Sequence, residues 1–328
     1  MAVLVTGGAG YIGSHMVLNL TDAGEDVVVL DNLVTGFDWA IDGRARFEQG
    51  NAADIELVRR LIDKHGITEI VHFAGSIVVP ESVSNPLKYY GNNTATSRNL
   101  IEAAVAGGVK HFIFSSTAAV YGMTGLAPVV EETPLNPMSP YGRSKLMTEW
   151  MLQDVAAAHP LTFGVLRYFN VAGADPQKRS GQSTPFATHL IKVACQTALG
   201  QREKMDIFGT DYETPDGTCI RDYIHVTDLI AAHALMLGHL RRGGESTTIN
   251  CAYGQGYSVR QVVDTVRQVS GVNFRADEGP RRPGDPASIT ATGEKVRSLL
   301  GWVPQHDNLD EIVQHAYEWE RYLQMRNS

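Results

Sequence analysis

The chain of 328 residues is long enough for about two domains, and 43% hydrophobic with 20% charged residues is the composition of a globular protein. A formal net charge of −8 argues against a general nucleic-acid or anionic-membrane surface. The three cysteines have no metal-ligand spacing, so we expect free thiols in the reducing cytoplasm and no metal site. No apolar run approaches the roughly 20 residues that span a bilayer, and the short run at 2–5 does not resemble a signal peptide.

The first half of the chain alternates apolar runs with amphipathic stretches. Strands are predicted at 2–5, 26–31, 46–50, 69–75, 111–116 and 163–170, with helices at 12–23 and 54–65 between them. Nearly continuous apolar strands with helix-length connections are typical of an α/β fold in which a doubly wound parallel sheet is covered on both faces.

The second half has shorter elements. A polar, turn-rich loop is predicted at 175–185, and a strand leading into a helix at 222–240. We therefore expect a first domain over residues 1–170 and a smaller α/β domain over residues 171–328, with 222–240 packing back on the first.

A glycine-rich motif, VTGGAGYIGSH, occupies residues 5–15 between the first strand and the first helix. Gly7, Gly10 and Gly13 have the spacing that lets a backbone turn tightly and approach a pyrophosphate, which then lies on free N–H groups at the helix N-terminus. This is the dinucleotide loop of a Rossmann domain. The plainer interpretation is a glycine turn that only packs the helix on the strand.

Asp31 ends the second strand, 18 residues after Gly13. A carboxylate there can accept hydrogen bonds from the ribose hydroxyls of the cofactor and would repel a 2′-phosphate. The residues 32–34 offer no arginine for such a phosphate. The sequence therefore favours NAD over NADP.

Tyr141 and Lys145 are one helical turn apart and follow Pro140, which suits a helix start. An isolated pair of this kind is better explained as a surface tyrosine and a solvated lysine. Here, however, a nucleotide loop lies upstream. An ammonium group and a positive nicotinamide ring would both favour the phenolate, so Tyr141 could act as a base. Thr117, or Ser116 beside it, could hold the substrate oxygen.

Further motifs accompany these residues. They are DN at 31–32, FAG at 73–75, SSTAAVYG at 115–122, SPYGRSK at 139–145, RYFNVAGADP at 167–176, GTDYETPDGTCIRDYIHV at 209–226 and RRPGD at 281–285. Together they resemble the UDP-glucose (UDP-galactose) 4-epimerase family of the extended short-chain dehydrogenase/reductases, from residue 2 to about residue 320.

The resemblance implies a mechanism and a set of contacts. Tyr141 would take the proton of the sugar O4 while hydride passes from C4 to NAD; the 4-keto sugar would rotate and receive the hydride on its other face. Lys145 would tune Tyr141 and bind the nicotinamide ribose, and Thr117 would hold O4. The implied cofactor contacts are Gly7, Gly10, Tyr11, Ile12, Gly13, Asp31, Asn32, Asn51, Ala52, Phe73, Ala74, Gly75, Asn92, Ser115, Tyr141, Lys145 and Tyr168.

The substrate implied by the resemblance is a UDP-hexose. Its implied contacts are Thr117, Asn170, His189, Leu190, Asp206, Ile207, Phe208, Arg221, Tyr223, Arg282 and Asp285. Arg221 and Arg282 would bind the diphosphate and Asp285 the uridine ribose, because the planar guanidinium fits phosphate well. Plainer alternatives are an Arg221–Asp222 ion pair, a core position for Phe208 and a helix cap for Asn92.

The chain departs from the family pattern at several positions, among them Thr117, which stands where many members have serine and keeps the hydroxyl. Asn51 replaces an acidic residue near the adenine, and Ile77 replaces a lysine found in many members near the NAD phosphates. One charged cofactor contact is therefore missing, and weaker retention of NAD is expected. ATHL, with His189, replaces a Pro-Asn-Asn segment. Ile289, where a large residue disfavours N-acetylated sugars, is of middling size and favours UDP-glucose and UDP-galactose only weakly.

Other functions remain open from the sequence. Epimerisation of UDP-N-acetylhexosamines or UDP-pentoses is one, and a non-catalytic NAD-sensing regulator is another. A dehydratase is disfavoured because Ala118 and Ala119 follow Thr117 where dehydratases carry an acidic pair. Relatives pair the helices matching 93–106 and 145–158, so a homodimer is expected. A buried core face would explain the apolar stripe of the second helix equally well; the stripe contains Leu146, Met147, Trp150, Met151 and Val155.

Overall fold

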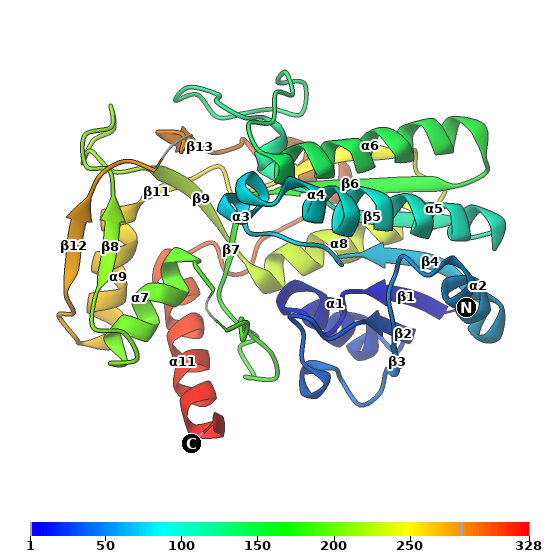
Figure 1. The fold of residues 1–328 in the computed structure, drawn as a ribbon, viewed down its shortest axis with the longest axis horizontal. Helices are drawn as coiled ribbons and strands as arrows, with labels where there is room; N and C mark the ends of the chain where they lie inside the picture. Colours follow the sequence, from blue (N-terminus) through cyan, green and yellow to red (C-terminus); the bar gives the residue numbers. More distant parts are fainter. Residues whose placement is uncertain (1, 186, 283–284, 328) are drawn as a thin grey trace.

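The larger layer of the molecule is a seven-stranded sheet in which all neighbouring strands are parallel. The computed structural model describes residues 2–185, 187–282 and 285–327, so Pro283 and Gly284 of the RRPGD motif lie outside it. The strand order is β10-β6-β5-β4-β1-β2-β3 (Figure 1). The strands are β1 (Ala2–Thr6), β2 (Asp26–Asp31), β3 (Arg46–Gln49), β4 (Ile67–His72), β5 (His111–Ser115), β6 (Thr162–Tyr168) and β10 (Thr247–Cys251).

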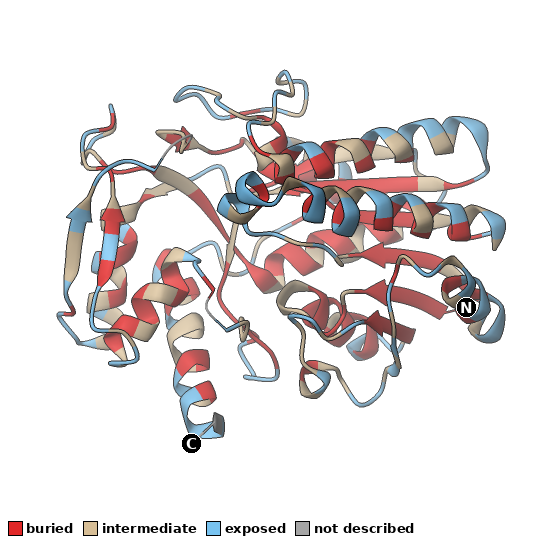
Figure 2. Ribbon diagram, in the orientation of Figure 1, coloured by how far each residue is buried: buried red, intermediate tan, exposed pale blue. Residues whose placement is uncertain are grey.

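Helices cover both faces of this sheet. On one face, α1 (Tyr11–Asp22), α8 (Val226–Arg241) and α10 (Glu294–Leu300) enclose a core around Val5, Met16 and Met236. On the other, α2 (Ile55–His65), α5 (Thr96–Ala106) and α6 (Pro140–Ala158) enclose a core around Leu4, Leu100 and Leu152. Except for the exposed edge strand β3, the strands are therefore buried along almost their whole length (Figure 2), which confirms the doubly wound α/β prediction.

Short helical segments complete the larger layer, and all of them except the first in chain order contact α6. They are η1 (Asp38–Ala40), α3 (Val79–Ser84), α4 (Pro86–Tyr89), the π-helical turn η2 (Tyr90–Ala95), which runs into α5, and η3 (Ala118–Val120). None of the helices in the described part of the chain is both long and apolar enough to cross a membrane.

The smaller lobe contains two small sheets and three helices (Figure 1, left). One sheet has β9 (Ile220–His225) at its centre, paired with β7 (Asn170–Ala172), β11 (Gly256–Ser258) and β13 (Ser288–Ile289). The other pairs β8 (Met205–Phe208) with β12 (Ala276–Gly279). The helices α7 (Leu190–Ala198), α9 (Val259–Ser270) and α11 (Leu309–Asn327) pack against them around a core that includes Ile191, Val262 and Ile312.

Two segments differ from the sequence prediction in a way that shapes the site. The predicted strand 163–170 is broken at Phe169, and its end belongs to β7, in the smaller lobe. The predicted strand 69–75 ends at His72, so Phe73, Ala74 and Gly75 form an irregular segment beside the glycine loop. In addition β10, which follows α8, pairs with β6 as the seventh strand and was not predicted. The chain therefore crosses between the lobes more than once.

Candidate active site

The glycine loop between β1 and α1 has the shape of a cradle for a diphosphate. Gly7 has φ +74°, and a Cβ there would come within 2.6 Å of the backbone nitrogen of Ala74. A Cβ on Gly13 would overlap the carbonyl oxygen of Gly7. Gly10 caps α1 without a side-chain hydrogen bond, so the first N–H groups of the helix face the loop. These residues fit the pyrophosphate of a dinucleotide, and Gly7 and Gly13 admit no side chain.

Asp31 closes this cradle at the end of β2. Its side chain is buried, and its carboxylate accepts hydrogen bonds from the backbone N–H groups of Ala9 (3.0 Å) and Leu33 (2.8 Å). The same carboxylate thereby fixes the glycine loop and keeps further lone pairs for ribose hydroxyls. This is the position from which it would exclude a 2′-phosphate.

The first turn of α6 presents Tyr141 to the carboxyl ends of the central strands. Ser139 caps the helix by accepting a hydrogen bond from the Gly142 N–H (3.2 Å), and Pro140 occupies the first helical position. Tyr141 is buried, and its ring meets that of Tyr89 edge to face at 6.4 Å between centroids. The prediction of a helix start at Pro140 is confirmed, and a surface tyrosine is excluded.

The residues after β5 face this tyrosine. The phenol of Tyr141 is hydrogen bonded to the Thr117 side chain. One turn along α6, the Lys145 ammonium donates to the Ser115 carbonyl oxygen (2.9 Å) and lies 4.8 Å from the centre of the Phe114 ring. The Ser115 hydroxyl donates to the phenol oxygen of Tyr168 (2.9 Å), at the end of β6. A phenol, a hydroxyl and an ammonium thus gather at the carboxyl edge of the sheet, where open α/β sheets bind ligands.

Burial dominates the electrostatics of this cluster. It lowers the pKa of Lys145 to about 8, although the charge of Glu149 raises it. It also raises the pKa of Tyr141, while the hydrogen bond with Thr117 acts in the opposite direction. The Lys145 ammonium, one helical turn from Tyr141, is directed at the Ser115 carbonyl oxygen. The two causes expected from the sequence to favour the phenolate, the Lys145 ammonium and the positive nicotinamide ring, stay predictions.

A small pocket of the second lobe collects several of the expected substrate residues. It is lined by Tyr11, Asn170, His189, Leu190 and Tyr223, among others. Asn170 and Tyr223 are paired neighbours on β7 and β9, and His189 and Leu190 begin α7. The Tyr11 phenol donates to the Gly173 carbonyl oxygen (2.7 Å), so the cofactor helix and this pocket share a wall.

The other predicted substrate residues form two pairs. The Arg221 guanidinium bonds Asp285 (2.5 Å) rather than Asp222, which rules out the simple pair with its neighbour. The Arg282 guanidinium lies 3.9 Å from the centre of the Phe208 ring, so Phe208 is not a plain core residue. Asp206 bonds Lys204 on the surface, and the side chain of Ile207 is buried in the core of the smaller lobe.

The remaining predicted cofactor residues lie around the glycine loop or beyond it. Ile12 and Phe73 pack partly buried against the core of the α1 face, while Ala52 is buried with the α2 face. The side chains of Asn32 and Asn51 accept backbone hydrogen bonds from Val34 and Ala53 in their own turns. Asn92 is not a helix cap: it lies in η2 and donates to the Ser76 hydroxyl (3.1 Å).

The comparisons with known proteins agree with this geometry. A model of the NAD dependent epimerase/dehydratase family matches residues 3–252. This chain belongs to that family. The UDP-glucose 4-epimerase of Azospirillum brasilense is 56% identical over 322 residues, covering 98% of this chain and 92% of the relative.

Two solved structures of epimerases are also similar to this family member. The UDP-glucose 4-epimerase from Brucella ovis in complex with NAD has a TM-score of 0.94 at 40% identity and covers 97% of both chains. The UDP-Glc/GlcNAc 4-epimerase from the human pathogen Campylobacter jejuni has a TM-score of 0.86 at 46% identity, with coverage of 98% of this chain and 99% of that one.

A buried polar network lies behind the active-site cluster of this protein, and it was not predicted from the sequence. Ser116 does not face Tyr141: its hydroxyl donates to the Glu149 carboxylate (2.5 Å), which also pairs with Arg167 (2.6 Å). Asn93 bonds the Ser144 hydroxyl (2.9 Å) and the backbone of Ser76. Glu149 follows Lys145 by four residues, so helical spacing alone could have indicated it.

One cluster in the described chain has metal-ligating side chains. His306, Glu311 and His315 place one potential ligand atom each within 4.8 Å of one another. All three are engaged within the protein: His306 bonds Glu311 (2.7 Å), and Nδ1 of His315 lies 3.0 Å from Nε2 of His225. His225 also accepts the Thr227 N–H at the start of α8, so this cluster joins α8 to α11. The sequence expectation of no metal site stays a prediction.

Proposed function

We propose that this protein is an NAD-dependent UDP-glucose 4-epimerase that interconverts UDP-glucose and UDP-galactose. The observation that carries the proposal is the buried cluster of Tyr141, Thr117 and Lys145 beside a glycine loop shaped for a dinucleotide. NAD, when bound, accepts hydride from the sugar C4 and returns it to the opposite face. The net reaction inverts one carbon and leaves the redox state unchanged.

Each residue of the cluster has a distinct task. Tyr141 removes the proton of the sugar O4 through its phenol oxygen and later returns it, as a general base and acid. Thr117, hydrogen bonded to that phenol, holds the same sugar oxygen. Lys145 supplies positive charge in a buried site, which stabilises the developing phenolate.

The smaller lobe supplies the nucleotide anchors. Arg221 and Arg282 offer two guanidinium groups for the diphosphate, and Phe208, beneath Arg282, borders the uracil. Asp285 exchanges its bond with Arg221 for the uridine ribose. Asn170, His189 and Tyr223 line the pocket that receives the sugar end. Such an anchored nucleotide leaves the sugar free to rotate between the two hydride transfers.

The test is conversion of UDP-galactose by the purified protein, with and without added NAD, with UDP-glucose separated by chromatography. We expect an equilibrium mixture without accumulation of NADH.

Tyr141→Phe should lower kcat by about 10²–10⁴-fold, the usual contribution of a general base to the rate, and should retain NAD binding. Conversion that requires added NAD would be explained by the neutral Asn51 and Ile77. No conversion under either condition would contradict the substrate assignment.

A broader substrate range is the second candidate. The Campylobacter jejuni relative bears the name UDP-Glc/GlcNAc 4-epimerase, and it is 46% identical. In this chain Ile289 lies on β13 and is only partly buried. UDP-N-acetylglucosamine and a UDP-pentose should therefore be assayed in parallel. Activity on UDP-glucose and UDP-galactose alone would contradict the broader substrate range. A protein that binds NAD but converts none of these sugars would favour the non-catalytic NAD-sensing regulator.

We propose that the protein works as a homodimer in the cytoplasm. On α6, Leu146 is buried and Met151 and Val155 pack against the core of their own subunit, but the Trp150 side chain is 51% exposed. Apolar residues of α3 and α4, two short helices that contact α6, are also exposed, among them Val83 and Leu87. Trp150→Glu should convert a dimer into a monomer in sedimentation equilibrium. A monomeric wild-type mass at micromolar concentration would refute the dimer.

A further inference from the structure

The buried face of α6 is polar over three successive turns. Tyr141, Lys145 and Glu149 follow one another at intervals of four residues, and their exposed fractions are 9%, 4% and 0%. A helix normally buries an apolar stripe on a sheet, because an unpaired charge in the interior is costly. The first two residues belong to the proposed chemistry, whereas the third has no role in it. The presence of a third buried polar group therefore requires an explanation.

Glu149 is fully engaged by two neighbours. One carboxylate oxygen accepts the Ser116 hydroxyl at 2.5 Å, and both oxygens accept N–H groups of Arg167, at 2.6–3.1 Å. Arg167 is itself fixed, because it donates to the Tyr121 phenol oxygen (3.0 Å) and that phenol donates to Asn250 (2.6 Å). The carboxylate thus joins α6 to the end of β5 and to β6 through a rigid buried ion pair.

Ser116 lies between two residues of the reacting cluster. In an extended segment successive side chains point to opposite sides, so Ser116 faces Glu149 while Thr117 faces Tyr141. The carbonyl oxygen before it, on Ser115, receives the Lys145 ammonium. A displacement of Ser116 would therefore move both the hydroxyl that bonds Tyr141 and the carbonyl that orients Lys145. The carboxylate also acts on Lys145 directly, because its negative charge favours the ammonium form.

We infer that Glu149, held by Arg167, is a positioning residue for the epimerase reaction. It fixes the segment 115–117 through the Ser116 hydroxyl and sustains the positive charge of Lys145. Glu149 does not touch the substrate or the cofactor in this role. The inference rests on the proposed function, since it assigns Glu149 to the reaction performed by Tyr141, Thr117 and Lys145. Arg167 holds the carboxylate in place through both of its oxygens, and Ser116 transmits that position to the site.

Two variants separate the two parts of this role. Ser116→Ala removes the link and leaves the ion pair intact, so we expect kcat to fall about ten-fold with KM for UDP-galactose little changed. Glu149→Gln keeps a similar shape and removes the charge, so the high-pH decline of kcat should move to lower pH. Thr148→Val is the matched control: Thr148 is also buried on α6, but its hydroxyl bonds only the Ser144 carbonyl within the helix. It should keep the wild-type kcat and pH profile.

The expected shift in the pH profile of Glu149→Gln depends on the titratable groups around Lys145. Glu149 on α6 and His72 on β4 interact with its charge. Tyr141 lies one turn before it on α6, and Tyr168 bonds the hydroxyl of Ser115, whose carbonyl receives the ammonium. Burial and the charge of Lys145 together lower the pKa of His72 to about 3, so that histidine stays neutral throughout the assay range. Burial raises the pKa of both tyrosines. Lys145 is accordingly the group whose titration Glu149 can move.

Two further measurements keep the inference open to refutation. Glu149→Gln could fail to fold because Arg167 is left unpaired. In that case the double variant Glu149→Gln/Arg167→Met, which removes both charges, is used in place of the single variant. Phenolate formation in the NAD-bound protein is followed by ultraviolet difference absorbance, with Tyr141→Phe subtracted to isolate Tyr141. A purely structural role predicts lower thermal stability of Ser116→Ala and Glu149→Gln, with kcat per folded site, pH profile and Tyr141 titration unchanged. That result would overturn the inference.

Failure of the proposed function would look different. A wild-type protein that converts no UDP-hexose contradicts the epimerase assignment, and the Tyr141 titration then decides the positioning role without any turnover. A shift of that titration in both Ser116→Ala and Glu149→Gln, but not in Thr148→Val, supports positioning. An unmoved titration contradicts it.

Discussion

The charge of Lys145 changes close to neutral pH. Its pKa is about 8 because burial disfavours the ammonium form. Lys145 is therefore cationic below pH 8 and neutral above it, and the stabilisation that it gives to a phenolate is lost as pH rises through this value. Within the described part of the chain, Glu149 is the group whose charge favours the ammonium form of Lys145 and so opposes this loss.

We expect kcat of the wild-type protein to decline on the alkaline side with an inflection near pH 8. Lys145→Met should have a lower kcat at pH 7, and its profile should lack this decline, because no ammonium remains to be lost. Initial rates of UDP-galactose conversion, measured with NAD saturating from pH 6 to pH 10, provide the check. A decline of the same shape in Lys145→Met would assign the titration to another group.

The turn between β1 and α1 shows how an element depends on residues without side chains. Gly13 packs against the carbonyl of Gly7, so that α1 begins directly over the strand end. Gly13→Ala forces the turn apart, and we expect loss of measurable NADH binding together with a destabilisation of about 2–4 kcal/mol. NADH fluorescence and urea unfolding measure the two effects. Gly43→Ala, with open space around the added methyl group, is the control and should bind NADH like the wild type.

The central strand of the smaller lobe carries a buried acid. Asp222 on β9 accepts backbone N–H groups of Tyr253 and Gly254, both at 3.2 Å, yet desolvation raises its pKa to about 7. The unfolded chain has a pKa near 4 for this group. The stability that the neutral acid provides is therefore complete below pH 4 and is lost as pH rises through 7, by up to about 4 kcal/mol.

Asp222→Asn should flatten this part of the stability profile. We expect the difference in unfolding free energy between the variant and the wild type to change steadily from pH 4 to pH 7, in favour of the variant at higher pH. Urea unfolding at a series of pH values measures the difference. Asp264→Asn alters an exposed carboxylate on α9 and should leave the slope unchanged. An equal slope for Asp222→Asn and the wild type would show that Asp222 is ionised throughout.

The sequence was most informative where one element is specified by its own residues. DVVVLD reads as a buried strand because every position after Asp26 is apolar up to Asp31, and the glycine loop and the Tyr141–Lys145 spacing are likewise local patterns. TTINC of β10 was missed, since it mixes polar and apolar residues and is defined by pairing with β6 about 80 residues earlier. The Glu149–Arg167 pair was missed for the same reason: it exists only once α6 lies on β6.

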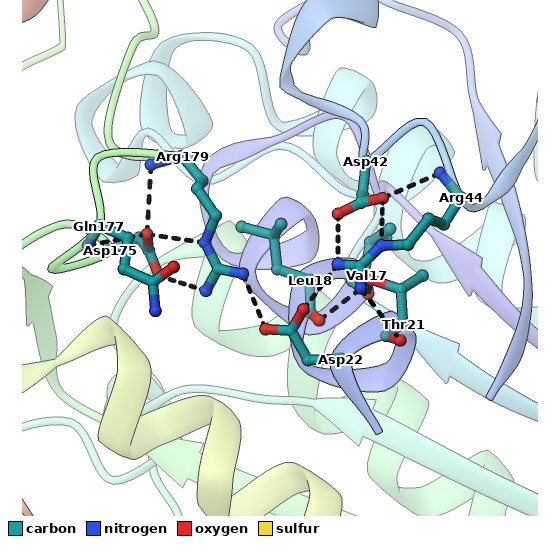
Figure 3. A network of polar contacts seen from close by, with 9 residues as sticks. All are labelled: Val17, Leu18, Thr21, Asp22, Asp42, Arg44, Asp175, Gln177 and Arg179. Atoms are coloured by element: carbon teal, nitrogen blue, oxygen red, sulfur yellow. Dashed lines mark hydrogen bonds and ion pairs between the residues drawn. The ribbon is translucent and has the colours of Figure 1, made fainter. Parts of the chain in front are cut away.

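At the scale of the whole molecule, a chain of ion pairs joins the two lobes across the surface. Figure 3 shows Arg179, from the loop after β7, between Asp175 of its own loop and Asp22 at the end of α1. Asp22 in turn bonds Arg44, which also holds Asp42. Hydrogen bonds from Arg179 and Arg44 lower the pKa of Asp22, so the network stays charged well below neutral pH.

Removing its central member should loosen the contact between the lobes. Arg179→Gln is expected to lower the unfolding free energy by about 1 kcal/mol, since half-exposed ion pairs are individually weak. Because salt screens such pairs, the deficit should shrink in molar sodium chloride. The midpoints of urea unfolding at low and high salt measure both effects. Arg98→Gln removes an ion pair within α5 and should lower the unfolding free energy by less than Arg179→Gln does. An equal decrease for the two variants would show that the ion pairs between the lobes contribute no more than a pair within one helix.

The return of β10 to the large sheet has a consequence for synthesis. When a ribosome has released the first 170 residues, six strands are complete, but β6 still lacks its outer neighbour and α8 has not covered the face beside α1. An uncovered strand edge and a bare apolar face are the features that draw nascent chains into aggregates. The part of the molecule built on the seven-stranded sheet therefore stays unfinished on the ribosome until α10, which ends at Leu300, has emerged. During that interval we expect the nascent chain to be prone to aggregation.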